Sequence, residues 1–358
     1  MVSVLFAETS VEIANAELIV DKFQQHFAEH FPVIREGTVL HYETEYGKVW
    51  MAGEKGRFQA EVNCYDAHVL MSIKAMLAEH LLEFSGDKDL RFRWQGHGAD
   101  LNQLPNLFEG RVVRAFNVTP HMRRLVISVS EGIERLMTGG LHVRILIVPQ
   151  GRTPVWPHLS QTGAVVWPEG DDELIRRVYT IRYGNVERQE IELDFVMHEG
   201  NHMPGAHFGA TAKAGDLVGI IGPGGGVVPV EVDACVFAGD ETALPVISRM
   251  VEELPAGKKI TVYAEVADEN ERQDIKSEAD VNWTWLYRNG KAAGTSGLLE
   301  QALRRHDWSE DRDSRHVFIA CEKGEVRQIK KFLSDEAKLP KNDFRTAGYW
   351  VLGEADDH

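Results

Sequence analysis

The sequence predicts a multidomain protein: a small α+β N-terminal domain, an antiparallel β-barrel and an α/β doubly wound domain. Three observations support this prediction of the fold class. Residues 1–95 mix amphipathic helical patterns with strand-like runs. Residues 106–228 contain short β-rich runs separated by turn residues, which is typical of a closed barrel. Over residues 232–353, strand and helix patterns alternate, which indicates a parallel sheet with helices on both faces.

The elements of the N-terminal domain follow from hydrophobic spacing and turn residues. Apolar residues at helical spacing predict a helix over 11–31, with Pro32 as its stop. A second helix is predicted over 66–84 by the same spacing. Turn formers separate three strand-like runs, at 38–44, 48–52 and 57–63. Residues 96–105 are rich in glycine and proline signals and make a linker to the barrel.

The remaining elements are predicted in the same way. The barrel is expected to contain strands at 111–117, 123–129, 143–148, 177–182, 191–198 and 216–221. The α/β domain is expected to contain strands at 234–238, 259–264 and 316–320, and helices at 243–254, 298–306 and 325–336. Pro245 lies in the first turn of its helix, where a missing N–H is tolerated.

Composition limits the class of protein. The 358 residues are 43% hydrophobic, which is ordinary for a globular protein. Their net charge of −16 would repel nucleic acid and anionic membrane surfaces, so neither is expected as a partner. No run approaches the roughly 18 apolar residues of a membrane span, and the first residues lack the features of a signal peptide. Three distant cysteines predict neither a disulfide framework nor a metal motif. We therefore expect a cytoplasmic protein without membrane insertion.

The histidines and nucleophiles predict no catalytic or metal site. His26 and His30 have i, i+4 spacing without an evident third ligand, so a solvated helix face is favoured. The spacing of His198, His202 and His207 is typical of no metal geometry, and no Ser-His-Asp or Cys-His set stands out in the sequence.

The most informative stretch is Arg177-Val178-Tyr179-Thr180-Ile181-Arg182. Side chains alternate along a strand, so Arg177 and Tyr179 share one face and Thr180 points to the other. An Arg beside a Tyr suits a flavin dinucleotide, which has a pyrophosphate at one end and a flat ring system at the other. The alternative is an exposed strand that carries two cations and a tyrosine.

Two glycine-containing turns are further candidates. The run Gly222-Pro223-Gly224-Gly225-Gly226 lets backbone approach a ligand closely, or serves as a domain hinge. The turn from Gly239 to Pro245 lies where a dinucleotide phosphate meets a helix N-terminus. Thr242 is placed to cap that helix, although Asp240 and Glu241 would repel a pyrophosphate. A well-capped helix with acidic first-turn residues explains this turn equally well.

An acidic residue after the next strand gives one more candidate. Glu265 lies about 25 residues beyond the turn, at the spacing of a carboxylate that binds a cofactor ribose in NAD sites. Asp268 and Glu269 compete for that role, and a solvated acidic turn is the alternative.

Together these motifs resemble the siderophore-interacting protein family of flavin reductases, which are relatives of the ferredoxin–NADP reductases. The resemblance spans about residues 106–353. It rests on the hexapeptide above and, in order, on Asp194-Phe195-Val196-x-His198, Gly222-Pro223-Gly224-Gly225, residues 237–245, Trp285-Leu286-x-Arg288 and Ala347-Gly348-Tyr349-Trp350. Residues 1–95 resemble a small uncharacterised domain fused ahead of some of these proteins.

The resemblance implies a non-covalently bound FAD. Arg177 would hold the pyrophosphate, Tyr179 would pack against the flavin or ribityl chain, and Thr180 would bond the flavin near N5. Residues 204–208 match the turn that offers backbone N–H groups to the phosphates, through Gly205 and Ala206. By the same resemblance we expect His198, Gly222, Gly224, Gly225, Gly239, Asp240, Thr242 and Glu265 at the cofactor sites. This chain departs from the family pattern at Ala206, Phe208 and Cys321.

The resemblance also implies the reaction. We expect a cytoplasmic reductase that passes electrons from NADPH or NADH through FAD to a ferric siderophore, with ferredoxin as an alternative donor. A basic pocket would attract the chelate, with Arg182, Arg249, Arg288 and Lys323 as candidates, although each alone is better explained as an ordinary surface cation. Tyr349 or Trp350 would cover the flavin, and a place in the core explains these aromatic residues equally well. The alternatives are a general NAD(P)H:flavin or ferric-chelate reductase and a non-catalytic siderophore-binding protein.

Overall fold

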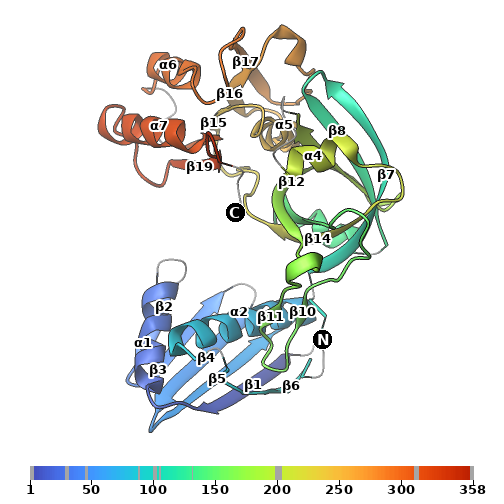
Figure 1. Ribbon diagram of the computed structural model, residues 1–358. Helices are drawn as coiled ribbons and strands as arrows, with labels where there is room; N and C mark the ends of the chain where they lie inside the picture. Colours follow the sequence, from blue (N-terminus) through green and yellow to red (C-terminus); the bar gives the residue numbers. More distant parts are fainter. Residues whose placement is uncertain are drawn as a thin grey trace. The chain divides into compact units, whose positions relative to one another are not determined.

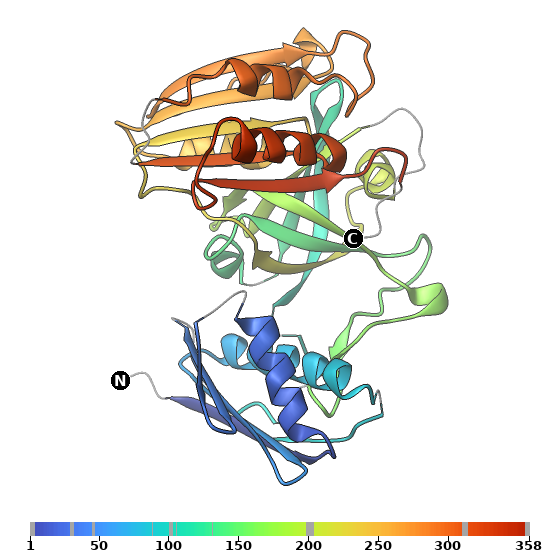
Figure 2. The same cartoon turned by 90° about the vertical axis from the view of Figure 1, so that its left-hand side faces the viewer.

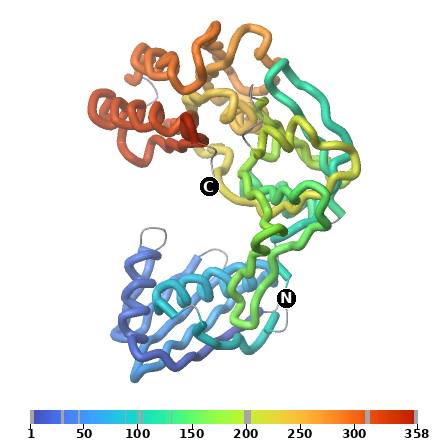
Figure 3. Tube along the Cα trace, viewed as in Figure 1, coloured from blue at the N-terminus to red at the C-terminus, as the bar shows by residue number. Residues whose placement is uncertain are grey.

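The structure, a computed structural model, describes residues 4–28, 32–44, 47–87, 89–99, 103–104, 106–130, 132–197, 204–309 and 314–354. The chain divides into two compact units (Figure 1). The first contains Met1–Leu107 together with Gly151–Glu173, and the second contains Phe108–Gln150 and Leu174–His358. The sequence analysis assigns 151–173 to the barrel domain, whereas these residues pack with the N-terminal unit, as the chain trace in Figure 3 shows.

The N-terminal unit contains a six-stranded antiparallel sheet with the order β2-β3-β4-β5-β1-β6. Its strands are β1 (Leu5–Glu12), β2 (Val33–Glu36), β3 (Val39–Thr44), β4 (Gly47–Glu54), β5 (Arg57–Cys64) and β6 (Trp94–Gly96). Helices α1 (Ala16–Phe27) and α2 (Ala67–Ser85) pack on one face of this sheet. The predicted α+β class is confirmed.

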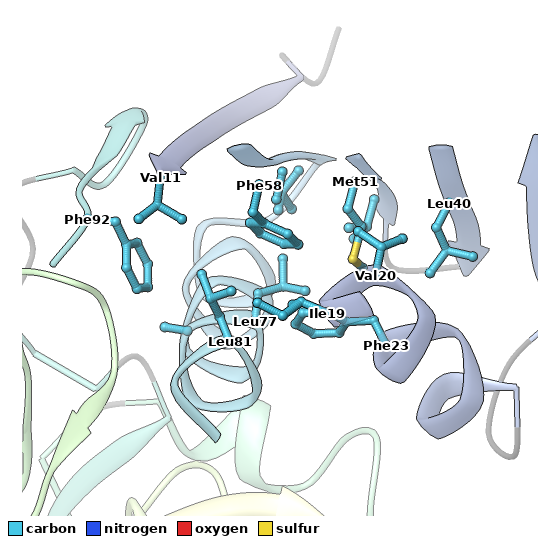
Figure 4. Packing of buried hydrophobic residues seen from close by; sticks show 14 of the residues in the cluster. Val11, Ile19, Val20, Phe23, Leu40, Met51, Phe58, Leu77, Leu81 and Phe92 are labelled. Carbon is cyan, nitrogen blue, oxygen red and sulfur yellow. The ribbon is translucent and has the colours of Figure 1, made fainter. Parts of the chain in front are cut away.

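Side chains from both helices and the sheet form one apolar core (Figure 4). Phe23 of α1 is fully buried, and its ring centroid lies 5.7 Å from that of Phe58 on β5. Leu77 and Leu81 of α2 point into the same core. Asp66 caps α2 by accepting hydrogen bonds from the backbone N–H groups of residues 68 and 69, which fixes where this helix begins.

The first helix begins later than predicted, because residues 5–12 form β1. Buried Ala7, Thr9 and Val11 alternate with exposed residues along this strand, which is the period-2 pattern of a half-buried strand. The predicted helix over 11–31 is therefore wrong at its start, since α1 begins only at Ala16.

The segment 151–173 leaves the barrel after β9 and returns to it at β12. It forms a short hairpin of β10 (His158–Leu159) and β11 (Val165–Val166), with a 3-10 turn, η1, at Gly170–Asp172. Trp94 donates a hydrogen bond from Nε1 to the carbonyl oxygen of Thr162 at 3.0 Å. Leu159 is buried at 3% exposure, so the hairpin is an integral part of the N-terminal unit.

We expect Trp94→Phe to lower the free energy of unfolding of this unit by about 1 kcal/mol, the usual net contribution of one hydrogen bond. The change keeps an aromatic ring and removes the donor to Thr162. Urea unfolding of the full chain measures it. Trp50→Phe, on the outer face of the sheet, serves as a matched control that should change stability less.

The second unit begins with a closed antiparallel barrel in the order β12-β13-β8-β7-β14-β9, as predicted. Its strands are β7 (Leu107–Thr119), β8 (Met122–Val129), β9 (His142–Ile147), β12 (Ile175–Asn185), β13 (Glu190–Val196) and β14 (Leu217–Gly224). Two short helices accompany them, α3 (Ile133–Leu136) and α4 (Pro204–Thr211). The sequence analysis treats residues 204–208 as a turn, whereas they form the first turns of α4.

The rest of the second unit is a five-stranded parallel sheet in the order β17-β16-β15-β18-β19. Its strands are β15 (Ala234–Gly239), β16 (Lys259–Val266), β17 (Asp280–Tyr287), β18 (Arg315–Glu322) and β19 (Phe344–Trp350). A 3-10 turn, η2, spans Glu269–Glu271, and the helices are α5 (Leu244–Glu253), α6 (Leu298–Arg305) and α7 (Lys323–Asp335).

Helix α5 packs on one face of this sheet, and α6 and α7 pack on the other (Figure 2). The predicted doubly wound architecture is confirmed. Among the described residues, none of the helices is both long and apolar enough to cross a membrane.

Candidate functional site

The first turn of α4 lies directly against Arg177 and Tyr179 of β12. A Cβ atom added to Gly205 would overlap Tyr179 Oη and would lie 3.4 Å from Arg177 Cγ. Only glycine therefore allows this approach of backbone to the two side chains. The first N–H groups of a helix have no intrahelical partner, so Gly205 and Ala206 bring backbone donors close to the Arg177 side chain. Such a group of donors suits a phosphate.

Tyr179 is held in a fixed position by aromatic packing. Its ring centroid lies 4.1 Å from that of Phe195 on β13, and Phe195 in turn contacts Phe208 of α4. Burial raises the pKa of the Tyr179 phenol above its ordinary value, so the side chain is neutral at physiological pH. Arg177 and Tyr179 thus combine a cation with a rigid, uncharged aromatic surface, as the sequence predicts.

Thr180, on the opposite face of β12, lies in a row that crosses three strands. It is paired with His142 of β9, which is paired with Gly224 of β14. His142 Nδ1 lies 3.1 Å from the carbonyl oxygen of Gly225, and its Nε2 lies 3.0 Å from Tyr349 Oη. Because a carbonyl only accepts, Nδ1 carries the proton and Nε2 accepts from the Tyr349 hydroxyl.

His142 thereby connects the barrel to β19 of the α/β sheet. Burial lowers the pKa of this imidazole, which favours the neutral form that both contacts require. No sequence motif identifies His142. Its importance depends on the register that places it between Thr180 and the glycine run, and register is not visible in a motif.

The glycine run closes the barrel beside this row. A Cβ on Gly222 would lie 2.8 Å from Val143 Cγ1, and Gly225 has a φ of 56°. Close approach at one position and left-handed backbone at the other require glycine there. Gly224 faces open space, so the backbone of the run is accessible in the row that contains Thr180, on the far side of His142.

The expected basic pocket is not formed by three of its four candidates. Arg182 makes a bidentate ion pair with Glu252 of α5 at 2.5 and 2.7 Å. Arg249 of α5 donates from Nη1 to the carbonyl oxygen of residue 181 at 2.9 Å and pairs with the carboxylate of residue 253. Arg288 is paired with Glu241. All three are buried. Arg182 and Arg249 fasten α5 to the barrel, and Arg288 joins the end of β17 to the turn after β15. Of the four candidates, only Lys323, at the start of α7, is exposed.

The turn after β15 also differs from its predicted role. Thr242 does not cap α5, because the N-cap is Ala243 and no side-chain cap bond forms. Instead, Thr242 donates through both its N–H and its hydroxyl to Asp240 Oδ1, at 2.9 and 2.6 Å. Gly239 is required for packing, since a Cβ there would lie 2.6 Å from the carbonyl oxygen of Ala320.

Buried carboxylates gather at the carboxyl edge of the parallel sheet. They are Asp240, Glu241, Glu265, Glu322 and Glu325, each 7% exposed or less. Trp350 donates to Asp240 Oδ2 at 2.7 Å, and Ser296 donates to Glu265 Oε2 at 2.6 Å. Burial raises the pKa of Asp240 to about 6 and that of Glu325 to about 7. The predicted ribose ligand Glu265 is therefore bonded within the chain at 1% exposure.

Charge is distributed unevenly between the parts of the chain. The barrel segments 108–150 and 174–228 carry 11 Lys and Arg against 9 Asp and Glu, although the whole chain has 39 against 55. The barrel is thus the one part with a positive balance, which favours an anionic ligand there. His198 lies outside the described residues. Within those residues, three or more His, Cys, Asp or Glu side chains nowhere gather in a way that would hold a metal.

We expect Gly205→Ala to weaken FAD binding at least tenfold, because the added methyl group overlaps Tyr179 Oη and displaces α4 from Arg177. Titration of the purified apoprotein with FAD, followed by flavin absorbance, measures this affinity. Lys213→Ala, beyond the end of α4, is the control. Equal FAD affinity in Gly205→Ala and the wild-type chain would contradict the assigned role of this turn.

Comparison with known proteins gives three family matches. The model of the siderophore-interacting FAD-binding domain matches residues 111–227, and that of the siderophore-interacting protein matches 232–353. Residues 8–95 match an uncharacterised domain conserved in bacteria.

Individual proteins agree with these matches. A siderophore utilization protein from T. fusca is 31% identical with a TM-score of 0.59, over 70% of this chain and 95% of that one. Ferric vibriobactin reductase ViuB of Vibrio cholerae is 28% identical over 61% of this chain and 79% of its own. Ferric acinetobactin reductase of Acinetobacter baumannii is 32% identical over 52% of this chain and 63% of its own.

Proposed function

Because the chain belongs to the siderophore-interacting protein family, we propose that it is an FAD-dependent ferric-siderophore reductase that draws electrons from NAD(P)H. Its FAD-binding domain and its similarity to two proteins named as ferric reductases support this proposal. FAD, when bound, supplies the capacity to accept two electrons together and to release them singly.

The observation that carries the proposal is the convergence of Arg177, Tyr179 and the first turn of α4 around Gly205. Arg177 and the N–H groups of Gly205 and Ala206 would hold the pyrophosphate. Tyr179 would pack against the flavin or ribityl chain. On the other face of β12, Thr180 would bond the flavin near N5.

The proposed reaction changes the oxidation state of the iron and leaves the siderophore intact. One two-electron donor reduces two Fe(III) to two Fe(II). Hard, anionic oxygen ligands hold Fe(II) more weakly than Fe(III), so reduction releases the metal. The electron step needs no proton-transfer residue, and the residues above have only to bind and orient.

Ferredoxin is a second candidate donor, and the acidic edge of the sheet favours it. Asp240 and Glu241 lie in the turn where a nicotinamide dinucleotide would place its pyrophosphate, and Glu265 lies at the expected ribose position. All three are bonded within the chain. Carboxylates repel phosphates, so binding of NAD(P)H there requires these groups to rearrange or to be protonated.

The experiment is anaerobic visible spectroscopy of the FAD-loaded protein. Bleaching by NADPH or NADH, followed by recovery when a ferric siderophore is added, is the expected result. A flavin that only dithionite or reduced ferredoxin bleaches would replace NAD(P)H with ferredoxin. Failure to bind FAD at all would contradict the proposal and leave a non-catalytic siderophore-binding protein.

Comparing turnover rates with different ferric chelates distinguishes a siderophore reductase from a general ferric-chelate reductase. A siderophore reductase should reduce its siderophore complex faster than ferric citrate or ferric EDTA. Equal rates would identify a general ferric-chelate reductase. We further propose that the reaction takes place in the cytoplasm, where the three buried, free thiols would stay reduced.

A further inference from the structure

Two histidines meet on the surface of the N-terminal unit. His26 of α1 and His80 of α2 are far apart in the sequence, yet their Nε2 atoms lie 3.1 Å apart. The two helices pack side by side on the sheet (Figure 4). This packing brings the two rings into contact. The sequence analysis considered His26 only with His30, which lies outside the described residues.

The hydrogen bonding of His80 presents a lone pair at this contact. Its Nδ1 lies 2.8 Å from the carbonyl oxygen of Met76, which can only accept, so Nδ1 carries the proton. The Nε2 of the neutral ring is then an acceptor, and His26 Nε2 donates to it. A metal that binds both Nε2 atoms displaces this proton from His26 Nε2, either to His26 Nδ1 or to solvent. An imidazole that donates one N–H to a backbone carbonyl and offers the other nitrogen is the usual arrangement of a metal-ligating histidine.

The orientation of the rings also suits a shared ligand. Their centroids are 4.6 Å apart and their planes make an angle of 47°. If the two rings met head to head in a straight line, the distance between their centroids would exceed the Nε2–Nε2 distance by two ring radii. The observed centroid distance exceeds the Nε2–Nε2 distance by less than that. The rings are therefore tilted, and their Nε2 atoms converge on one side.

Aromatic neighbours hold the two rings in this arrangement. Phe84 lies 5.4 Å from the His80 ring and 6.1 Å from the His26 ring, between centroids. Phe27 lies 5.4 Å from His26 and 5.6 Å from His80. The pair is therefore positioned by packing as well as by its own contact.

We infer that His26 and His80 form a binding site for a first-row transition-metal dication such as Zn(II), Ni(II) or Fe(II), the class that imidazole favours. A spacing of 3.1 Å fits two ligands in adjacent positions around one ion, with metal–nitrogen distances of about 2.0–2.1 Å. Among the described residues no third His, Cys, Asp or Glu completes the set, and water would complete the coordination of a bound ion. Such an open site binds its metal reversibly.

Calorimetric titration of the full, untagged and EDTA-treated chain with ZnCl₂ and with NiCl₂ tests this inference. We expect one ion per chain, and affinity at least tenfold weaker in His26→Gln and in His80→Gln. His68→Gln, near the other end of α2, is the matched control and should bind like the wild-type chain.

Thermal unfolding gives a second readout, because an ion that binds only the folded state raises the midpoint. The midpoint should rise with Zn(II) in the wild-type and His68→Gln chains and stay constant in the other two. The inference is overturned if neither metal binds. It is equally overturned if binding persists in the His26→Gln/His80→Gln double variant. The test does not involve flavin, so its outcome is independent of the proposed reductase activity.

Discussion

Replacing Glu252 with alanine is expected to lower the free energy of unfolding by about 3–5 kcal/mol, because a buried guanidinium loses its carboxylate. The Arg182 side chain is 2% exposed and makes two hydrogen bonds to Glu252. Tyr183 also loses its acceptor, since its hydroxyl donates to Glu252 Oε1 at 2.9 Å. Equilibrium urea unfolding of the full chain measures the loss.

Two comparisons test whether the loss of stability in Glu252→Ala arises because the Arg182–Glu252 ion pair is buried. The double variant Arg182→Met/Glu252→Leu should recover most of the stability, because an apolar pair removes the unpaired charge. Glu336→Ala breaks another bidentate pair, with Arg304, which lies on the surface, and it should change stability little. If Glu252→Ala were as mild as Glu336→Ala, the pair would not hold α5 to the barrel.

Replacing Glu325 with glutamine is expected to stabilise the protein by about 3 kcal/mol at pH 8. Burial, and then the negative charges of Glu265 and Asp240, raise the pKa of Glu325 to about 7 from 4.5. Its Oε1 atom is buried and has no hydrogen-bond partner. Ionisation in the folded state is therefore costly, and the amide removes that cost.

The stabilisation by Glu325→Gln should depend on pH, because the pKa of Glu325 is raised only in the folded chain. Below about pH 4.5 the carboxyl group is protonated whether or not the chain is folded, so the variant should gain nothing. Between about pH 4.5 and 7 the wild-type chain loses stability as pH rises, and above pH 7 the difference is constant. Urea unfolding at several pH values tests this. Glu278→Gln, an exposed carboxylate, is the control, and a pH-independent gain in Glu325→Gln would contradict the explanation.

The barrel, and the shared strand face of Arg177 and Tyr179, could be predicted because their signals are local. Alternating apolar residues and turn formers locate all six barrel strands, and Arg177 and Tyr179 share a face because strand side chains alternate. The structure places both side chains against α4 at Gly205, which is one of the predicted cofactor-binding residues. The helix itself was missed, because residues 204–211 contain two glycines and no helical stripe of apolar residues.

Other features were missed because they depend on distant partners. Nothing near Arg182 in the sequence shows that a carboxylate 70 residues away pairs with it, so the sequence suggests only a surface cation or a candidate for the basic pocket. His142 and His80 gain their partners only when strands or helices pack together. Strand β17 was also missed, although Trp283, Trp285 and Tyr287 follow a period of two.

The division of the chain has a consequence for its synthesis. Residues 108–150, which form the first half of the barrel, leave the ribosome before the N-terminal unit has received Gly151–Glu173. Domains usually fold one after another as the chain emerges. The hydrogen bond from Trp94 to Thr162 can form only after β7, β8 and β9 have been synthesised, because Thr162 follows them in the chain. The barrel can close only after β12 has been synthesised, and β12 follows Gly151–Glu173. The two units therefore complete their folding in an interleaved order.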